Sequence, residues 1–263
     1  AVKMEPSYPT ARISLGDAYR AQGQPDLALA EFQAATRANP ASAEAWGALA
    51  AETLLRGDVP EAISIYQRAV EVEPGYVQSY TDLGNLYQAL GQWESAEAVY
   101  RQVYDANAPL LLFLKDLNVP APRALAAAAE YLLNAAIRRA FESPVFDLND
   151  VRKLLDATIM HGVTLDATFL EMPIRRCMER AAENFRLRPD DSDTLQQLDA
   201  IAGLLPDFSF EINLRTVQNI FFHIQKEVGP QIKKKAGRRD KKAREWIAVF
   251  NGLGQKIGMK TES

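Results

Sequence analysis

Residues 43–74, AEAWGALAAETLLRGDVPEAISIYQRAVEVEP, decide the fold, because the stretches on both sides repeat their pattern. Shifting the chain by 34 residues brings like residues together in seven classes of position. The classes are leucine (Leu15, Leu49, Leu83), a small residue (Gly16, Ala50, Gly84), glycine (Gly23, Gly57, Gly91), alanine (Ala28, Ala62, Ala96), an aromatic ring (Phe32, Tyr66, Tyr100), a further small apolar residue (Ala35, Ala69, Val103) and proline (Pro6, Pro40, Pro74). Self-similarity at such a period indicates an architecture of stacked structural repeats.

Each class has a physical role in a pair of helices. The glycines can adopt the left-handed conformation that often ends a helix. The small residue lets the two helices approach closely, and the aromatic ring fills the space between repeats. The proline stops the second helix and begins the next turn, and Pro109 lies one residue late for a further copy. The pattern therefore predicts one helix–turn–helix pair per repeat.

These positions resemble the tetratricopeptide repeat family. The resemblance implies that the pairs stack into a right-handed superhelix with a concave groove, each burying its apolar face against its neighbours. We assign residues 9–42, 43–76 and 77–108 to three repeats and residues 109–263 to a C-terminal helical domain, so the predicted fold class is all-α. Because AVKMEP at 1–6 resembles AVEVEP at 69–74, we expect residues 1–8 to end a truncated upstream repeat. The alternative is a natural capping stub.

In this family the first helix of each repeat lines the groove. The equivalent positions here are Thr10, Ile13, Asp17, Arg20, Glu44, Gly47, Ala51, Leu54, Gln78, Thr81, Asn85 and Gln88. Members that bind chaperones grip a peptide carboxylate with Lys, Asn and Arg, and only Asn85 and Arg20 stand in roughly suitable places here. We therefore expect a protein partner, bound as an extended peptide or a helix. The alternative is that these residues are only the solvated inner wall.

The helical pattern continues beyond the repeats. Caps and stops predict helices over 121–142, from Asp147 or Asn149 to Gly162, from Thr164 or Asp166 to Arg188, from Asp191 or Ser192 to Leu205, from Asn213 to about Gln225, and over 240–257. Pro173 must kink the third of these or start a second helix within it. Residues 208–212 are the only candidate strand, and they are too few to matter.

Residues 113–142, 211–222 and 243–259 resemble the helical domain of unknown function that follows the catalytic barrel in some family 57 glycoside hydrolase-like proteins. The motifs are Asn213-Leu214, Gln218-Asn219, and Trp246 with Phe250, Leu253 and Gly254. Arg215 stands where that family leads us to expect an aromatic residue. The resemblance implies an alternative function, a non-catalytic accessory part of a glycan-processing enzyme or complex. Otherwise Asn213, Gln218 and Asn219 are a helix cap and satisfied amides.

No stretch of the sequence assembles a catalytic or cofactor site. His161 and His223 are far apart, and Cys177, the one cysteine, falls on the apolar side of its helix. We predict no enzyme activity, no cofactor and no metal site. The net charge of −4 and the lack of a long apolar run favour a chain without a membrane span. A single cysteine fits a reducing compartment, so we expect a cytoplasmic protein.

One basic cluster interrupts this acidic chain. It comprises Lys233, Lys234, Lys235, Arg238, Arg239, Lys241, Lys242 and Arg244. Such a cluster is a possible patch for an anionic partner. No aromatic residues lie within it, so we expect no specific nucleic acid. The alternative is a solvated loop with lysines that complement a helix C-terminus.

Overall fold

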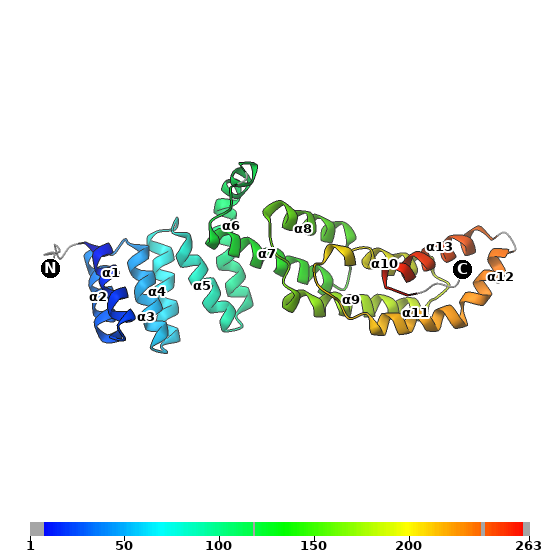
Figure 1. Ribbon diagram of the computed structural model, residues 1–263, viewed down its shortest axis with the longest axis horizontal. Coiled ribbons are helices and arrows are strands. Elements are labelled where there is room, and N and C mark those ends of the chain that lie inside the picture. The colour runs from blue at the N-terminus through cyan, green and yellow to red at the C-terminus, as the bar shows by residue number, and fades with distance from the viewer. Residues whose placement is uncertain (1–7, 118, 238–239, 260–263) are drawn as a thin grey trace. The chain divides into compact units, whose positions relative to one another are not determined.

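The computed structural model describes residues 8–117, 119–237 and 240–259, and these form α-helices with one short 3₁₀ helix. Figure 1 shows the helices in chain order. They are α1 (Pro9–Ala21), α2 (Pro25–Ala38), α3 (Ala43–Leu55), α4 (Val59–Val72), α5 (Val77–Ala89), α6 (Trp93–Asp116), α7 (Arg123–Glu142), α8 (Leu148–His161), α9 (Ala167–Leu187), α10 (Ser192–Ala202), η1 (Leu205–Asp207), α11 (Arg215–Glu227), α12 (Gly229–Gly237) and α13 (Lys241–Lys256). The predicted all-α fold class, a repeat solenoid followed by a helical domain, is confirmed.

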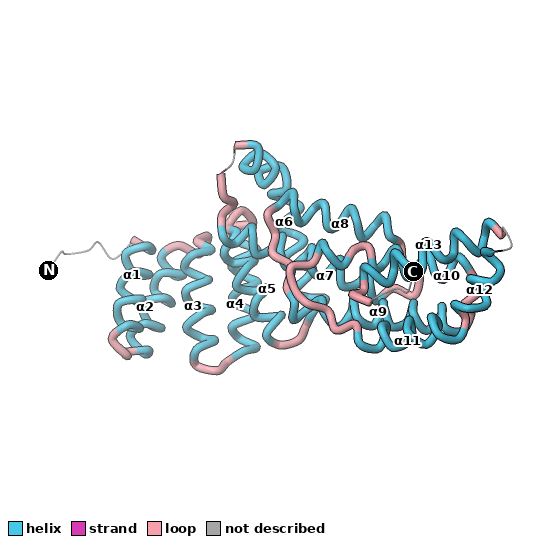
Figure 2. The backbone as a smooth tube through the Cα atoms, turned by 45° about the vertical axis from the view of Figure 1, so that its right-hand side comes forward, coloured by secondary structure: helices cyan, strands magenta, loops and turns pink. Residues whose placement is uncertain are grey.

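Each predicted repeat is a pair of packed helices: α1 with α2, α3 with α4, and α5 with α6. Short loops join the helices of each pair, as the tube in Figure 2 shows. The glycines that follow the first helices have φ of 71° at Gly23, 87° at Gly57 and 71° at Gly91, as the left-handed prediction requires. Side chains cap two helices of the middle repeat, because Ser42 accepts from the N–H of Ala45 and Asp58 from that of Glu61.

The small residue of the repeat allows an aromatic ring to lie against the first helix. A Cβ added to Gly16 would lie 2.5 Å from the Phe32 ring, and one added to Gly84 would lie 2.7 Å from the Tyr100 ring. Phe32 and Tyr100 are almost completely buried. The predicted close approach is confirmed at Gly16 and Gly84, where it brings together the two helices of the first and third repeats.

The first helices of the repeats lie against one another. α1 packs against α3 and α3 against α5, whereas the second helices α2 and α4 approach each other less closely. The first helices are therefore on the inner side of the stack, and α2 and α4 are on the outer side.

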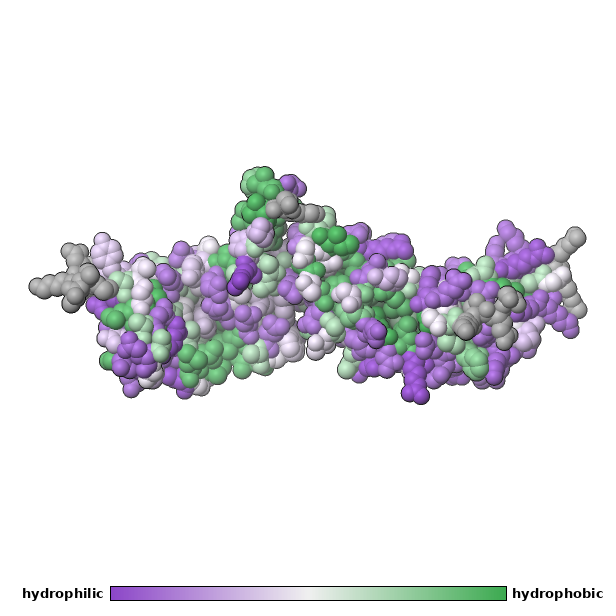
Figure 3. Space-filling view, in the orientation of Figure 1, coloured by the Kyte–Doolittle hydropathy of each residue, from purple (hydrophilic) through white to green (hydrophobic). Residues whose placement is uncertain are grey.

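The second helix of the third repeat differs from the prediction. Proline was expected to stop this helix, but α6 continues through Pro109 to Asp116. The reason is tertiary packing: Leu111 is buried in one core with Leu125 and Ala128 of α7. Leu110, Leu112 and Phe113 remain exposed, and Figure 3 shows hydrophobic side chains gathered at this end of α6.

Four of the C-terminal helices begin at predicted caps, whereas α11 begins after Leu214 without a side-chain cap and α12 was not predicted. Asp147, Asp166, Asp191 and Asp240 each accept a hydrogen bond from a backbone N–H of the following helix. Pro173 lies inside a continuous α9. Within the described residues, 208–212 form no strand.

Aromatic stacking organises the C-terminal core. Phe250 stacks on Phe221, with ring centroids 4.1 Å apart, and on Trp246, with centroids 4.6 Å apart. The indole N–H of Trp246 donates to the carbonyl of Pro189. This core joins α9, α11 and α13 around one cluster of rings.

The chain divides into two compact units, residues 1–132 and 133–263. The boundary between the two units lies within α7, whereas the sequence pattern predicts that the repeats end at residue 108. Among the described residues, no helix is both long enough and apolar enough to cross a membrane.

Candidate functional site

The candidate site is the inner surface formed by α1, α3 and α5, called here the inner face. Among the predicted groove residues, Thr10, Asp17, Glu44, Gln78 and Asn85 are exposed, and Arg20, Gly47, Ala51, Leu54 and Gln88 are half-buried. The inner face thus carries a row of accessible side chains drawn from all three repeats.

Two of the predicted groove residues belong to the core. Ile13 is 7% exposed and packs among Phe32 and Leu49. Thr81 is 6% exposed, and its hydroxyl donates to the carbonyl of Val77 one turn earlier. A partner would therefore have little access to either side chain.

On α1, two predicted groove residues of opposite charge, Arg20 and Asp17, pair with each other. The guanidinium of Arg20 donates to the carboxylate of Asp17 on the same helix. It also lies 5.5 Å from the centroid of the Phe32 ring, a cation–π arrangement. Arg20 is therefore held by its own repeat, which leaves it a poor clamp for a peptide carboxylate.

The aromatic position of each repeat presents a different group to the inner face. In the third repeat, the Tyr100 hydroxyl donates to Oδ1 of Asn85 at 2.6 Å. In the second repeat, Ala51 takes the place of Asn85, and the Tyr66 hydroxyl makes no hydrogen bond within the described part of the chain. In the first repeat the residue is Phe32, which has no hydroxyl. Tyr66 thus has a hydroxyl group without a hydrogen-bond partner among the described residues.

Tyr66 lies between charges from two other repeats. Burial and, to a lesser extent, the negative charge of Asp82 on α5 raise the pKa of Tyr66 to about 12, although Arg20 on α1 acts in the opposite direction. The side chain is 4% exposed. Most of the Tyr66 side chain is therefore buried, and the charge of Asp82 acts on its hydroxyl.

Asp82 itself is a half-buried carboxylate. Nε2 of Gln78 donates to its Oδ1 at 2.7 Å. Burial raises the pKa of Asp82, while the hydrogen bond from Gln78 lowers it. Across residues 8–117, 119–237 and 240–259, no basic side chain pairs with Asp82, so its charge is left without a counterion.

Sequence reasoning did not mark Asp82 of α5 or the Tyr66 hydroxyl of α4, on which the charge of Asp82 acts. The family pattern assigns the groove to other positions of the first helix, and Tyr66 reads only as the repeat's core aromatic residue. One signal was present: Asn85 is replaced by Ala51 in the second repeat while the tyrosine is kept.

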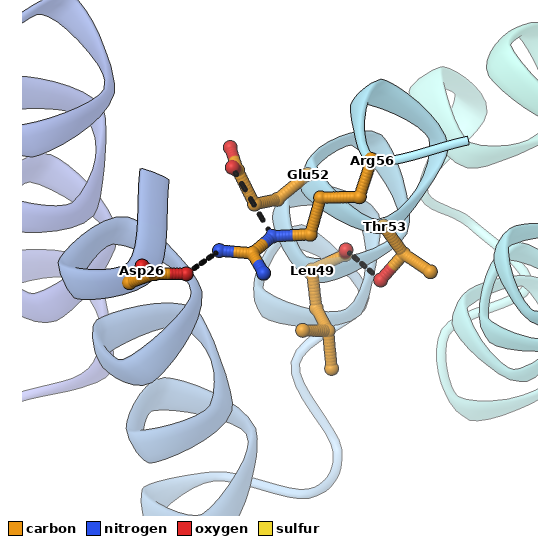
Figure 4. Close-up of polar contacts among 5 residues, drawn as sticks. All are labelled: Asp26, Leu49, Glu52, Thr53 and Arg56. Carbon is orange, nitrogen blue, oxygen red and sulfur yellow. Dashed lines mark hydrogen bonds and ion pairs between the residues drawn. The ribbon is translucent and has the colours of Figure 1, made fainter. Parts of the chain in front are cut away.

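A buried acid joins the first two repeats. Glu52 of α3 is 1% exposed, its Oε1 lies 3.8 Å from Nε of Arg56, and Arg56 reaches Oδ1 of Asp26 on α2 at 2.7 Å (Figure 4). Oε2 of Glu52 has no hydrogen-bond partner among the described residues. Figure 4 also shows Thr53, whose hydroxyl donates to the carbonyl of Leu49. We assign this group a structural role between repeats.

The predicted basic patch lies on α12 and at the start of α13. Its described lysines, Lys233, Lys234, Lys235, Lys241 and Lys242, are all exposed, and Arg238 and Arg239 lie outside the described residues. Lys241 faces Glu245 at 3.7 Å. Lys233 also lines a pocket of about 70 Å³ with Trp246 and Phe250. The patch stays a prediction.

The remaining candidate residues of the C-terminal unit make structural contacts. Gln218 donates to the carbonyl of Ile257, and Asn213 accepts from the N–H of Arg215, while Asn219 is exposed. Burial raises the pKa of the Cys177 thiol, and Arg180 lowers it. No group of three or more His, Cys, Asp and Glu side chains in the described ranges is placed to hold a metal.

Comparison with known families places repeats in the N-terminal part of the chain. Residues 1–76 match one tetratricopeptide repeat model and residues 54–109 match another. These matches confirm the predicted repeats, whereas the resemblance of the C-terminal part to a glycoside hydrolase-associated domain stays a prediction. Proteins with tetratricopeptide repeats generally mediate protein–protein interactions, and the fold is typically a non-catalytic scaffold.

Two curated relatives match part of the chain. Human superkiller complex protein 3 is 30% identical over 100 residues, which is 38% of this chain. Tetratricopeptide repeat protein 37 of Xenopus laevis is 27% identical over 100 residues. The chain spans 6% of the length of each of these curated relatives.

Two solved structures are similar at low sequence identity. MamA is 18% identical with a TM-score of 0.43, over 60% of this chain and 80% of that one. The Podosopora anserina kinesin light chain-like repeat protein is 15% identical with a TM-score of 0.41, over 97% of this chain and 99% of that one.

Proposed function

We propose that the repeat region is a protein-binding module whose inner face holds an extended segment of a partner protein. The observation that carries this proposal is the row of accessible side chains on α1, α3 and α5, which lie against one another. An extended segment can cross these helices and meet a different side chain on each.

The composition of the inner face also supports a peptide ligand. Exposed amides at Gln78 and Asn85 can donate to and accept from a peptide backbone. The half-buried Ala51 and Leu54 supply apolar contact on the neighbouring α3. Affinity in such interfaces comes from a few anchor residues rather than from the area covered.

The test is an affinity pull-down from the source cells with three baits, read by mass spectrometry. The first bait is the native chain. The second carries Asp17→Ala, Arg20→Ala, Asn85→Ala and Gln88→Ala. The third, a matched control on the second helices α2, α4 and α6, carries Gln33→Ala, Arg37→Ala, Ser64→Ala and Glu94→Ala. Both variants keep the net charge of the native chain.

We expect a partner that the native chain and the control retain and the inner-face variant loses. A partner that the inner-face variant retains would contradict the proposal, as would one that both variants lose equally. Recovery of polysaccharide without protein would instead favour an accessory role in glycan processing.

A further inference from the structure

We propose that the pocket between α11, α12 and α13 binds a short aliphatic carboxylate, with the hydrocarbon group in the pocket and the carboxylate held by Gln225, Asn251 and Lys233. The site lies in the C-terminal unit, so this inference goes beyond the proposed function of the repeats and does not depend on it. It also specifies the chemistry of one part of the predicted basic patch.

The first argument is the size of the pocket. Three successive helices form its walls, including Gln225 of α11, Pro230 and Lys233 of α12, and Trp246, Phe250 and Asn251 of α13. Its volume is about 70 Å³. An engineered apolar cavity that holds benzene measures ~150 Å³, so a small branched aliphatic group fits this pocket better than an aromatic ring does.

The second argument is that the aromatic wall is already in place. The indole N–H of Trp246 donates to the carbonyl of Pro189 at 2.9 Å, and the indole ring stacks on Phe250 with centroids 4.6 Å apart. Phe250 stacks in turn on Phe221. Because these contacts hold the rings, a ligand does not have to order them on binding. Because Pro189 occupies the one polar atom of the indole, Trp246 offers only apolar surface to the pocket.

The third argument is a pair of amides without partners. Gln225 and Asn251 are half-buried, and their side chains make no hydrogen bond with any described residue. Half-buried amides are partly shielded from water, so a ligand that completes their hydrogen bonds is favoured. Each amide has two N–H donors, which suit the oxygens of a carboxylate.

The fourth argument is the sign of the charge. Among the described residues that line the pocket, Lys233 is the one charged side chain. The surrounding stretch, residues 226–245, carries nine basic side chains and three acidic ones, although the whole chain has a net charge of −4. A positive local field raises the concentration of anions at the pocket. The pocket therefore favours a carboxylate over an ammonium group or a neutral amide.

A second pocket, between α10 and α13, also reaches Trp246 and has a volume of about 250 Å³. Lys242 and Glu245 both line it, so it does not favour one sign of charge. Gln196 of α10 lines it as well, and the amide of this residue provides an internal control for binding at the first pocket.

The experiment is an NMR titration of the ¹⁵N-labelled full chain with isovalerate, a branched aliphatic carboxylate. We expect the side-chain amide signals of Gln225 and Asn251 to shift with saturation and a Kd of about 1 mM, while those of Gln196 do not shift. Isovaleramide has the same shape without the charge, and it should bind at least about fivefold more weakly.

Two exposed lysines of α12 provide matched variants. Lys233→Gln removes the charge that lines the pocket and should weaken isovalerate binding about fivefold or more. Lys234→Gln changes the net charge equally on the same helix but lies outside the pocket lining, so it should change the affinity less than about twofold. Asn251→Leu keeps the size of the side chain but removes the amide, and it should also weaken binding.

A second arm identifies the source of the carboxylate by comparing the peptide Gly-Ser-Gly-Ser-Leu with its C-terminal amide. Tighter binding of the free-acid peptide than of isovalerate assigns the pocket to the C-terminus of a protein. Binding of isovalerate without binding of the peptide assigns it to a free aliphatic acid. Either result supports the inference.

Three results would overturn the inference. The first is no saturable shift at Gln225 and Asn251 with isovalerate or the free-acid peptide up to about 20 mM. The second is equal binding of isovaleramide, which would exclude recognition of the charge. The third is equal weakening by Lys233→Gln and Lys234→Gln, which would leave only a general attraction of anions. The proposed function of the repeats stands or falls separately.

Discussion

Asp82 carries a charge that its burial makes unfavourable in the folded chain. Its carboxylate is half-buried without a counterion, and its pKa lies above the ordinary 3.8, so the folded chain binds this proton more tightly than the unfolded chain. We expect Asp82→Asn to raise the melting temperature at pH 7 by about 1–3 °C. The gain should shrink as the pH falls towards 3.8, where both states become protonated. Thermal melts at pH 7 and pH 4.5 test this, and a lower melting temperature for the variant at pH 7 would contradict it.

The contact between Glu52 and Arg56 leads to a second prediction about single residues. Removing Arg56 leaves the buried Glu52 carboxylate without the cation that pairs with it, so Arg56→Ala should lower the free energy of unfolding by about 2–3 kcal/mol. The third repeat carries Leu86 at the position of Glu52 and buries it. Glu52→Leu added to Arg56→Ala should therefore recover most of the loss. Urea denaturation of both variants measures this, and a double variant no more stable than Arg56→Ala would refute the account.

At the scale of the element, the small position of the first helix determines how close the second can come. Tyr100 is held against Gly84 by its hydrogen bond to Asn85, so a methyl group at Gly84 would push the ring away. We expect Gly84→Ala to destabilise the third repeat by about 1–3 kcal/mol. Ala50 is the native counterpart in the second repeat, where the Tyr66 hydroxyl is not tied. Hydrogen exchange should therefore rise in α5 and α6, and unchanged exchange there would argue against this packing.

The repeats could be predicted from sequence because three copies show the same residue classes at the same spacing. Gly23, Gly57 and Gly91 specify a turn by their own conformation, which is local. The continuation of α6 through Pro109 could not be predicted in this way, because it depends on Leu111 meeting α7. The unpartnered Tyr66 hydroxyl could not be predicted for the same reason. The charges that act on it lie on α1 and α5, far from it in sequence.

At the scale of the whole molecule, the repeats and the C-terminal helices have separate cores. One core draws on residues from 137 onward, and the repeat clusters end at Leu132. Phe250→Ala removes a ring stacked on both sides and should cost about 3–5 kcal/mol in the C-terminal unit. Hydrogen exchange should rise over residues 133–259 and stay unchanged over residues 9–89. An equal rise in the repeats would show that the units unfold together.

The central claim is that the inner face, rather than the outer one, holds the partner. Site-specific photo-crosslinking tests it most directly, with benzoylphenylalanine placed at Gln88 on α5 or at Gln33 on α2 of the full chain in its source cells. The account predicts a crosslinked protein adduct from Gln88 and none from Gln33. An adduct from Gln33 alone, or equal adducts from both positions, would contradict it.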